Sequence, residues 1–567
     1  MAERRAAVDV AIVGLGAAGG VAAHVLTEAG LEVAAIEAGP RLSADDYALD
    51  EVRNEVRDWM AQPKAAHEVP TWRSGPEEEA GPAPGPMLMV NAVGGTSIHY
   101  EGISMRFLPW NFESRSATIA RYGEGAIPTG STLADWPLTY EDLEPYYEEI
   151  ERTIGIAGAA ARVRGQAVDP AGNFFEAERA APYPMPLLRR AGYEKLMGEA
   201  AGRLGWHPFT APAAVNSVEY DGRPACTYCG FCQYNGCHCD AKGATSLNVI
   251  ATAEATGRLR VETEARVLRI DTGDDGLAAG VTFVRDGREC FQPAKVVLVA
   301  TFTYENSRLL LLSKTKAFPN GLANNAGQVG KHYIAHVTPV VYGRFPGRRL
   351  NLFNGIGAQA SCVDDWNGDN FDHADLGFVG GGMLTAMHEV MPIAFARRPL
   401  PPGVPRWGSG WKSWVKENAQ SVGSAVAQFD ALPYEYNYLD LDPRVTDPHG
   451  LPVIRVNHRL APNEERGHDF LQGKIHEWMR AAGATETWNY PGFSLEPRHC
   501  YGGTRMGEDA ESSVVDADGF AHEVPNLCVL GASTFPSAAG HNPTLTVQAH
   551  AWRASHHLLD RWGTLGG

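Results

Sequence analysis

Three glycines and one acidic residue near the start of the chain have the types and spacing needed to hold a phosphate and a sugar. The glycines lie in Gly14-Leu15-Gly16-Ala17-Ala18-Gly19. Gly14 permits a tight turn, Gly16 lets a pyrophosphate approach the backbone, and Gly19 lets a helix pack closely on a strand. Glu37 lies 18 residues after Gly19, where a carboxylate can accept hydrogen bonds from a ribose diol and repel a 2′-phosphate. The spacing therefore predicts FAD or NAD rather than NADP.

Five of the nine cysteines crowd into 14 residues in the middle of the chain. They are Cys226, Cys229, Cys232, Cys237 and Cys239. Their spacing differs from the two separated pairs of a zinc ribbon, and short spacings among several thiolates suit iron–sulfur ligation better. The spacing therefore favours an iron–sulfur cluster here, with zinc, or thiols packed without a metal, as the alternatives.

Strand and helix patterns place the first glycines between a strand and a helix. Val8 to Val13 is a β-rich apolar run, residues 17–29 have a helical pattern that ends at Gly30, and residues 31–36 have the pattern of a second buried strand. The free N–H groups and the dipole at the start of such a helix can hold a phosphate without a lysine. A βαβ unit that binds no ligand is the alternative interpretation.

A second glycine loop follows an apolar, strand-like approach at residues 87–93. Paired glycines allow the backbone to pass close to a flat or anionic ligand, so we expect this loop to contact a flavin and its phosphates. The predicted contact residues are Gly94, Gly95, Thr96, Ser97 and His99.

The composition is that of a globular enzyme. A chain of 567 residues with 20% charged and 9% aromatic residues suits two intimately connected domains. The net charge of −18 argues against nucleic acids and anionic membranes as partners. No apolar run reaches the roughly 18 residues of a membrane helix, and the fold begins by Val8, which leaves no room for a signal peptide. We therefore expect a cytoplasmic protein with no membrane insertion.

The remaining patterns predict a mixed fold: α/β plus α+β, with a Rossmann-like FAD-binding domain and a substrate domain built on a largely antiparallel sheet. Strands are expected between residues 259 and 300 and at 337–345, 349–353, 377–387 and 453–456, and helices at 142–154 and 461–482. The polar segment 41–86 is expected to be a surface excursion without catalytic residues.

The order of these motifs resembles that of the glucose-methanol-choline (GMC) oxidoreductases. Residues 136–151, which begin Trp136-Pro137-Leu138-Thr139-Tyr140, are similar to that family's "WP…Y" segment. The C-terminal segments are more specific: residues 498–507 resemble the family's "H…GG…MG" element, and residues 526–546 its last strand and flavin-contacting loop, followed by its final helix from Val547. The sugar dehydrogenase and pyranose oxidase-like branches are the most similar. The resemblance implies a discontinuous FAD-binding domain at 1–110, 225–330 and 495–567, and a substrate-binding domain with its excursions at 111–224 and 331–494.

This resemblance implies FAD as the cofactor and His499 and Asn542 as the catalytic residues. A neutral imidazole suits the removal of an alcohol proton, and the developing alkoxide needs hydrogen-bond donors. His541 is the rival to Asn542, but alternation along an extended segment sends neighbours to opposite sides. His99 occupies the place where pyranose oxidases attach FAD covalently, whereas related sugar dehydrogenases have a similar loop without that bond. The implied cofactor contacts in the tail are Gly531, Ala532, Asn542, Pro543 and Thr544.

The resemblance further implies oxidation of a secondary alcohol of a sugar, glycoside or cyclitol to a ketone, by hydride transfer to flavin N5. Electrons would pass to a non-oxygen acceptor, such as a protein or a quinone. The alternatives are an oxygen-using pyranose-type oxidase, a sterol or long-chain alcohol oxidase, and a flavin-dependent lyase. A cysteine-rich metal-binding interaction protein is the alternative from another class.

Overall fold

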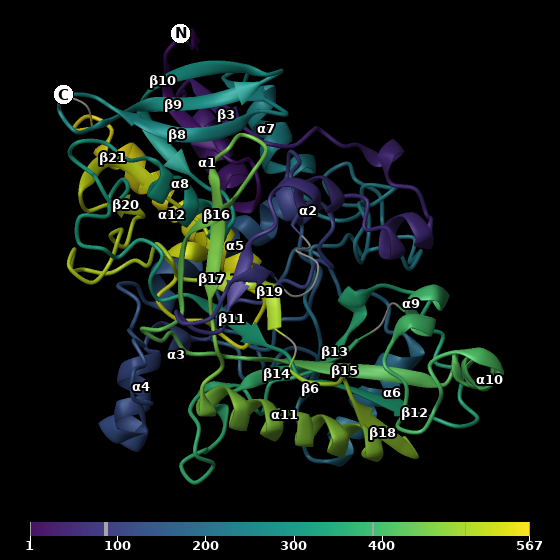
Figure 1. Cartoon of the computed structure of the whole chain (residues 1–567). Helices are drawn as coiled ribbons and strands as arrows, with labels where there is room; N and C mark the ends of the chain where they lie inside the picture. The colour runs from purple at the N-terminus through teal and green to yellow at the C-terminus, as the bar shows by residue number, and fades with distance from the viewer. Residues whose placement is uncertain (1, 84–88, 388–389, 494, 566–567) are drawn as a thin grey trace.

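The computed structural model describes residues 2–83, 89–387, 390–493 and 495–565. Its strands form separate sheets, one at the top of Figure 1 and one at the bottom, with a smaller sheet between them. Within the described ranges, every helix is too short or too polar to traverse a bilayer.

The first sheet is built around the strand that precedes the glycines. β2 (Val8–Val13) pairs in parallel with β3 (Val33–Ile36) on one side and with β10 (Arg288–Val299) on the other. The order continues through β7 (Leu259–Glu262) at one edge and β21 (Val524–Val529) and β20 (Phe520–Ala521) at the other. β8 (Arg266–Thr272) and β9 (Ala278–Arg285) extend it, and β1 (Glu3–Arg4) pairs with β10. The βαβ prediction is confirmed, although the second strand begins at residue 33 rather than 31.

Two helices from opposite ends of the sequence pack against each other, and the first of them packs on β2 and β3. α1 (Ala17–Glu28) follows the glycines directly, and α12 (Thr544–Arg561) packs against both α1 and α5 (Tyr140–Ile154). Gly19 is required where α1 crosses the preceding turn, because a Cβ there would lie 2.1 Å from the Gly14 carbonyl oxygen. The helix predicted after Thr139 is confirmed, with the Thr139 hydroxyl accepting from the Asp142 backbone N–H at 3.3 Å.

The second sheet is antiparallel, as the pattern predicted. Its strand order is β18 (Glu486–Asn489), β12 (Val340–Arg344), β15 (Val422–Phe429), β14 (Gly382–Met387), β13 (Ser361–Val363) and β6 (Pro208–Thr210). β11 (Ile334–Val337) also pairs with β15, and β19 (Leu495–Tyr501) pairs with β11. Helix α11 (Pro462–Ala481) runs along one face of this sheet in Figure 1 and packs on β15. β19 falls in a segment predicted for the FAD-binding domain, yet it pairs with β11 of this sheet. The domain boundaries remain a prediction.

A third sheet shows that the segment 41–86 is more than a surface excursion. β16 (Tyr438–Thr446) pairs with β17 (Pro452–Asn457), and β17 pairs in parallel with β4 (Thr71–Arg73), which pairs with β5 (Gly81–Pro82).

Two strand predictions are wrong. Residues 349–353 form a loop in which Leu350 and Leu352 are buried without a strand partner, and residues 89–93 are not a strand. Met87 and Leu88 lie outside the described residues.

Candidate active site

A cavity opens where the glycine motifs meet. Most of the residues predicted to bind a dinucleotide line it: Gly14, Gly16, Glu37, Gly95, Thr96, Ser97, Gly531, Ala532, Pro543 and Thr544. The first turns of α1 and of α12 both contribute to this lining. Because a helix N-terminus presents free N–H groups and a positive dipole end, the cavity suits an anionic ligand such as a pyrophosphate.

Glu37 lies at the end of β3, where its carboxylate is fixed by two backbone groups. It accepts from the Leu15 N–H at 3.0 Å and from the Gly39 N–H at 3.0 Å. Burial raises the pKa of this carboxyl, and these two N–H groups, Arg266 and Lys64 oppose the shift. The carboxylate is therefore held in place at the cavity wall, as the interaction with a ribose diol requires.

The second glycine loop packs directly against the first. Gly94 and Gly95 have φ angles of +101° and +55°, a conformation that favours glycine. A Cβ on Gly95 would lie 2.9 Å from the Cα of Gly16, so the two backbones approach too closely for a side chain. The Ser97 hydroxyl donates to the Gly94 carbonyl at 2.6 Å, which closes the loop on itself. This geometry supports the prediction that the loop contacts a bound cofactor.

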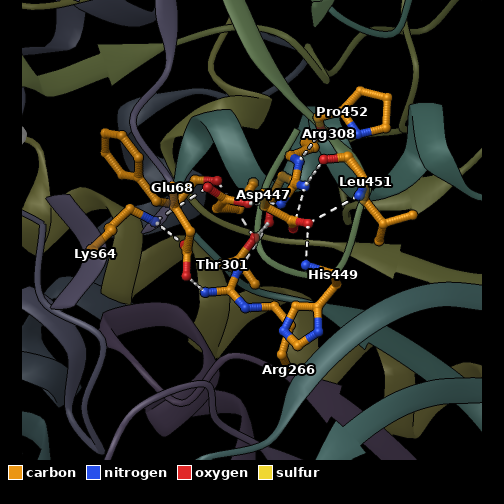
Figure 2. A network of polar contacts seen from close by, with 12 residues as sticks. Lys64, Glu68, Arg266, Thr301, Arg308, Asp447, His449, Leu451 and Pro452 are labelled. Atoms are coloured by element: carbon orange, nitrogen blue, oxygen red, sulfur yellow. Dashed lines mark hydrogen bonds and ion pairs between the residues drawn. The ribbon is translucent and has the colours of Figure 1, made fainter. Parts of the chain in front are cut away.

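A cluster of buried charges forms the cavity wall near Glu37, and we call it the Lys64 cluster (Figure 2). Its members are Lys64, Glu68, Arg266, Glu305, Arg308 and Asp447. Lys64 contacts Glu305 at 3.2 Å and Glu68 at 3.3 Å, and Arg308 contacts Asp447 at 2.7 Å. Although burial opposes it, Lys64, with Arg308 and Arg266, lowers the pKa of Glu305 to about 2. The cluster joins α2 (Gln62–His67) to α8 (Thr303–Leu312) and to the turn after β16.

Sequence reasoning missed this cluster, because it expected no role for residues 41–86. Lys64 is 4% exposed and is 241 positions from Glu305, so no local pattern marks the pair. The mixed signs of the cluster leave little net charge for the phosphates, which the helix N-termini can hold.

Replacing Lys64 with methionine is expected to lower the free energy of unfolding by about 1.5–3 kcal/mol. Methionine keeps the apolar stem and removes the buried ammonium, while Arg308 and Arg266 still neutralise Glu305 and Glu68 in part. Urea denaturation of the holoenzyme measures the change. Lys412→Met on the exposed side of α10 (Gly408–Asn418) is the matched control and should leave the midpoint unchanged. Equal midpoints for both variants would show that the Lys64 cluster does not stabilise the fold.

His499 lies on β19 between Arg498 and Cys500, two residues that line the cavity. Its Nδ1 is 3.2 Å from Nδ1 of His336 on the neighbouring strand β11. His336 is completely buried, and its Nε2 is 2.7 Å from the Ala539 carbonyl oxygen and 3.0 Å from the Tyr501 hydroxyl. His336 was not predicted as a site residue, because a lone histidine in a strand carries no functional signal of its own.

Asn542 and His541 occupy different environments, as alternation predicted. The Asn542 Oδ1 atom is buried and makes no hydrogen bond with the described residues. His541 is fully buried, with Nδ1 2.9 Å from the Arg106 carbonyl oxygen and Nε2 3.0 Å from Asp364. Although burial opposes it, Asp364 raises the pKa of His541, and His541 likewise lowers the pKa of Asp364. His541 therefore belongs to a buried ion pair with Asp364, whereas Oδ1 of Asn542 makes no hydrogen bond with the described residues.

Some predicted residues are not among the described residues that line the cavity: Gly19, Gly94, His99, His499 and Asn542. Gly19 and Gly94 act through backbone packing, and His499 and Asn542 each adjoin a lining residue. His99 is 7% exposed and follows the lining residues Gly95 to Ser97. Covalent attachment of FAD at His99 stays untested.

The cysteine segment is held to the wall of the cavity by Lys242. The buried ammonium of Lys242 donates to the carbonyl oxygens of Tyr100, Cys232 and Asn235 at 2.8–3.1 Å. The sulfur atoms of Cys237 and Cys239 are 3.7 Å apart, and the hydrogen bond from Cys239 lowers the pKa of Cys237 to about 5. Among the residues that the structure describes, no group of three or more His, Cys, Asp or Glu side chains could hold a metal ion. The predicted iron–sulfur cluster therefore gains no support from this part of the chain.

Comparison with known proteins agrees with the geometry of the site. A GMC oxidoreductase family model matches residues 433–551. The gluconate 2-dehydrogenase flavoprotein of Pantoea cypripedii is 32% identical over 580 residues, which cover 98% of this chain and 94% of that protein. The chain belongs to the GMC oxidoreductase family. This confirms the resemblance on which the catalytic predictions rest.

Further similarities extend over the whole of this GMC oxidoreductase. The 6'''-hydroxyparomomycin C oxidase of Streptomyces lividus is 28% identical, over 98% of this chain and 92% of that protein. The solved structure of pyridoxine 4-oxidase from Mesorbium loti has a TM-score of 0.61 at 16% identity and covers 97% of this chain and 99% of its own. At that identity the likeness shows the fold alone, and it confirms the predicted fold class.

The cofactor and the general activity follow from the family. This GMC oxidoreductase is an FAD-dependent enzyme that acts on CH–OH groups. The residues present fit FAD, because two helix N-termini, the Gly16–Gly95 approach and the fixed Glu37 carboxylate line one cavity. Glu37 would hold the ribose, and the N-termini of α1 and α12 would hold the pyrophosphate.

Proposed function

We propose that this enzyme oxidises a secondary alcohol of a sugar, glycoside or cyclitol to a ketone and passes the electrons to a non-oxygen acceptor. The proposal is supported by the position of His499 and Asn542 in the chain, next to residues that line the cavity. His499 adjoins the lining residues Arg498 and Cys500, and Asn542 adjoins Pro543. His499 would supply the proton acceptor, and the side-chain amide of Asn542 would supply an N–H donor for the substrate oxygen.

In this proposal His499 takes the hydroxyl proton of the substrate, because a neutral imidazole has a pKa near the working pH. The side-chain NH2 group of Asn542 donates a hydrogen bond to the substrate oxygen as negative charge develops on that oxygen. Bound FAD supplies the acceptor for the hydride that leaves the substrate carbon. His541 takes no part in proton transfer, since both of its nitrogens are engaged by Asp364 and the Arg106 carbonyl.

The substrate class is supported by the relatives. One is named as a gluconate dehydrogenase and another as an oxidase of an aminoglycoside, so both act on sugar-derived alcohols by name. One of these relatives is named a dehydrogenase and the other an oxidase, so they differ in the electron acceptor that the name implies. The higher sequence identity to the dehydrogenase favours a non-oxygen acceptor. The iron–sulfur cluster stays a prediction from the cysteine spacing, and we derive no electron step through it.

Turnover with sugars, polyols, a sterol and a long-chain alcohol, followed in parallel with an electron-accepting dye and with oxygen alone, tests the substrate and acceptor together. We expect dye reduction to exceed peroxide formation, with a ketone as the product. Peroxide formed at the rate of dye reduction would establish an oxidase. Activity confined to sterols or long-chain alcohols would overturn the substrate class.

A further inference from the structure

The ring of a second histidine, His336, contacts the ring of His499. His336 on β11 and His499 on β19 belong to antiparallel neighbours, and the register shifts between Ala335 and His336. The two rings stand nearly perpendicular, at 89°, with their centroids 5.2 Å apart. Their Nδ1 atoms are 3.2 Å apart, a hydrogen-bond distance at which one must donate and the other accept.

The groups around Nε2 of His336 determine which of the two Nδ1 atoms donates the hydrogen bond. Its Nε2 is 2.7 Å from the Ala539 carbonyl oxygen, and a carbonyl oxygen can only accept, so Nε2 carries the hydrogen. The Tyr501 hydroxyl, 3.0 Å from the same nitrogen, is a second group on that side. A second hydrogen on Nδ1 would place a positive charge on a completely buried ring, which is costly, so the neutral form is favoured. Nδ1 of His336 is therefore an acceptor.

The tautomer of His499 follows. Since Nδ1 of His336 accepts, Nδ1 of His499 must carry the hydrogen that it donates. A neutral imidazole has only one N–H, so the lone pair of His499 is on Nε2. A series of hydrogen bonds, from the Ala539 carbonyl oxygen through His336 to His499, thus determines which nitrogen of His499 can take a proton.

We propose that His336 is a positioning residue that holds His499 in the Nδ1–H tautomer and keeps Nε2 as the basic nitrogen. This inference rests on the proposed function, in which His499 removes the alcohol proton. The hydroxyl proton moves to Nε2 of His499, the hydride leaves the substrate carbon for the cofactor, and the C–O bond becomes a carbonyl. The resulting His499 imidazolium still donates from Nδ1 to His336. Ala539 also belongs to the loop that carries Asn542, so one loop sets the orientation of both groups.

Two variants of nearly equal shape separate this role from simple packing. His336→Asn keeps an acceptor oxygen near the position of Nδ1, whereas His336→Leu fills similar space and cannot accept. The holoenzymes are compared by the rate of flavin reduction in anaerobic stopped flow, by KM, and by the imidazole ¹⁵N NMR signals of His499. FAD content and the thermal midpoint show whether each variant folds.

We expect His336→Leu to slow flavin reduction on the order of 10- to 100-fold with KM within a few-fold of wild type. His336→Asn should recover most of the rate. The ¹⁵N signals of wild-type His499 should report hydrogen on Nδ1, and those of the leucine variant a mixture of tautomers. Equal rates for the two variants, or a wild-type His499 with hydrogen on Nε2, would overturn the inference.

Results that would contradict the proposed function differ from those that would contradict the role of His336. If His499→Ala reduces its flavin as fast as wild type, His499 is not the proton acceptor, whatever its tautomer. If His499→Ala is inactive but the leucine variant at position 336 reduces its flavin normally, only the role of His336 is lost. If both variants at position 336 lose FAD or stability, the tautomer of wild-type His499 decides the inference.

Discussion

Replacing His499 with alanine should slow reduction of the flavin by substrate roughly 10²- to 10⁴-fold while FAD stays bound. The imidazole is the proton acceptor in our proposal, and without it the hydroxyl proton has no positioned base. The glycine loops, Glu37 and the helix N-termini that line the cavity are unchanged in this variant, so the FAD content should stay the same. Anaerobic stopped-flow absorbance gives the rate, and the flavin-to-protein absorbance ratio gives the content.

The matched control is a histidine far along the last helix. His557 on α12 has a partly exposed side chain and contacts Asp518 at 3.5 Å. His557→Ala should reduce its flavin at the wild-type rate. Wild-type reduction in His499→Ala would contradict the assignment of the base, whereas loss of FAD from that variant would assign His499 a part in cofactor binding.

Replacing Asp364 with asparagine should lower the free energy of unfolding by about 3–5 kcal/mol near pH 5. Asp364 and His541 are both fully buried, and the carboxylate also accepts from Asn173 and Asn367 at 2.8 Å. Asparagine keeps the shape and removes the charge that offsets the His541 imidazolium. Chemical denaturation across a range of pH values measures the difference between wild type and variant.

The pH dependence of that difference has a defined sign. Asp364 raises the pKa of His541 above its ordinary 6.5, so this contribution is fully present below pH 6.5 and is lost as pH rises through the raised value. His541 lowers the pKa of Asp364 below its ordinary 3.8, so that contribution is present above pH 3.8 and is lost as pH falls through the lowered value. The difference should therefore be largest between pH 3.8 and 6.5.

The neighbouring carboxylate provides the control. Asp365 contacts the partly exposed His207 at 2.8 Å, so Asp365→Asn should cost at most about 1 kcal/mol. A difference between wild type and Asp364→Asn that stays constant from pH 4 to pH 9, or one no larger than that of Asp365→Asn, would contradict a charged buried pair.

Local patterns predicted the parts of this molecule that local physics determines. The strand, glycine turn and helix from Val8 to Glu28 follow from apolar runs and from backbone freedom at Gly14, so their sequence signal is self-contained. Burial alone was less reliable: Leu350 and Leu352 alternate as in a strand, but they cover the core from a loop. Alternation reports which side chains are buried and cannot report whether a strand partner exists.

Groups that act through distant partners could not be predicted. His336 meets His499 across 163 positions, and Lys64 meets Glu305 across 241 positions. Each is an ordinary residue in its own segment, and only the pairing of β11 with β19, or the packing of α2 on α8, gives it a role. The different environments of Asn542 and His541 could be predicted, because alternation along an extended segment already places adjacent side chains on opposite sides.

The most direct test of the proposed activity is the anaerobic visible spectrum of the purified protein before and after addition of sugars, glycosides and polyols. We predict that the bands of oxidised flavin bleach with at least one of these alcohols, and that they do not bleach in His499→Ala at the same concentration. Bands that stay oxidised with every alcohol would contradict the proposed oxidation and favour a reaction, such as a lyase reaction, in which the flavin is not turned over.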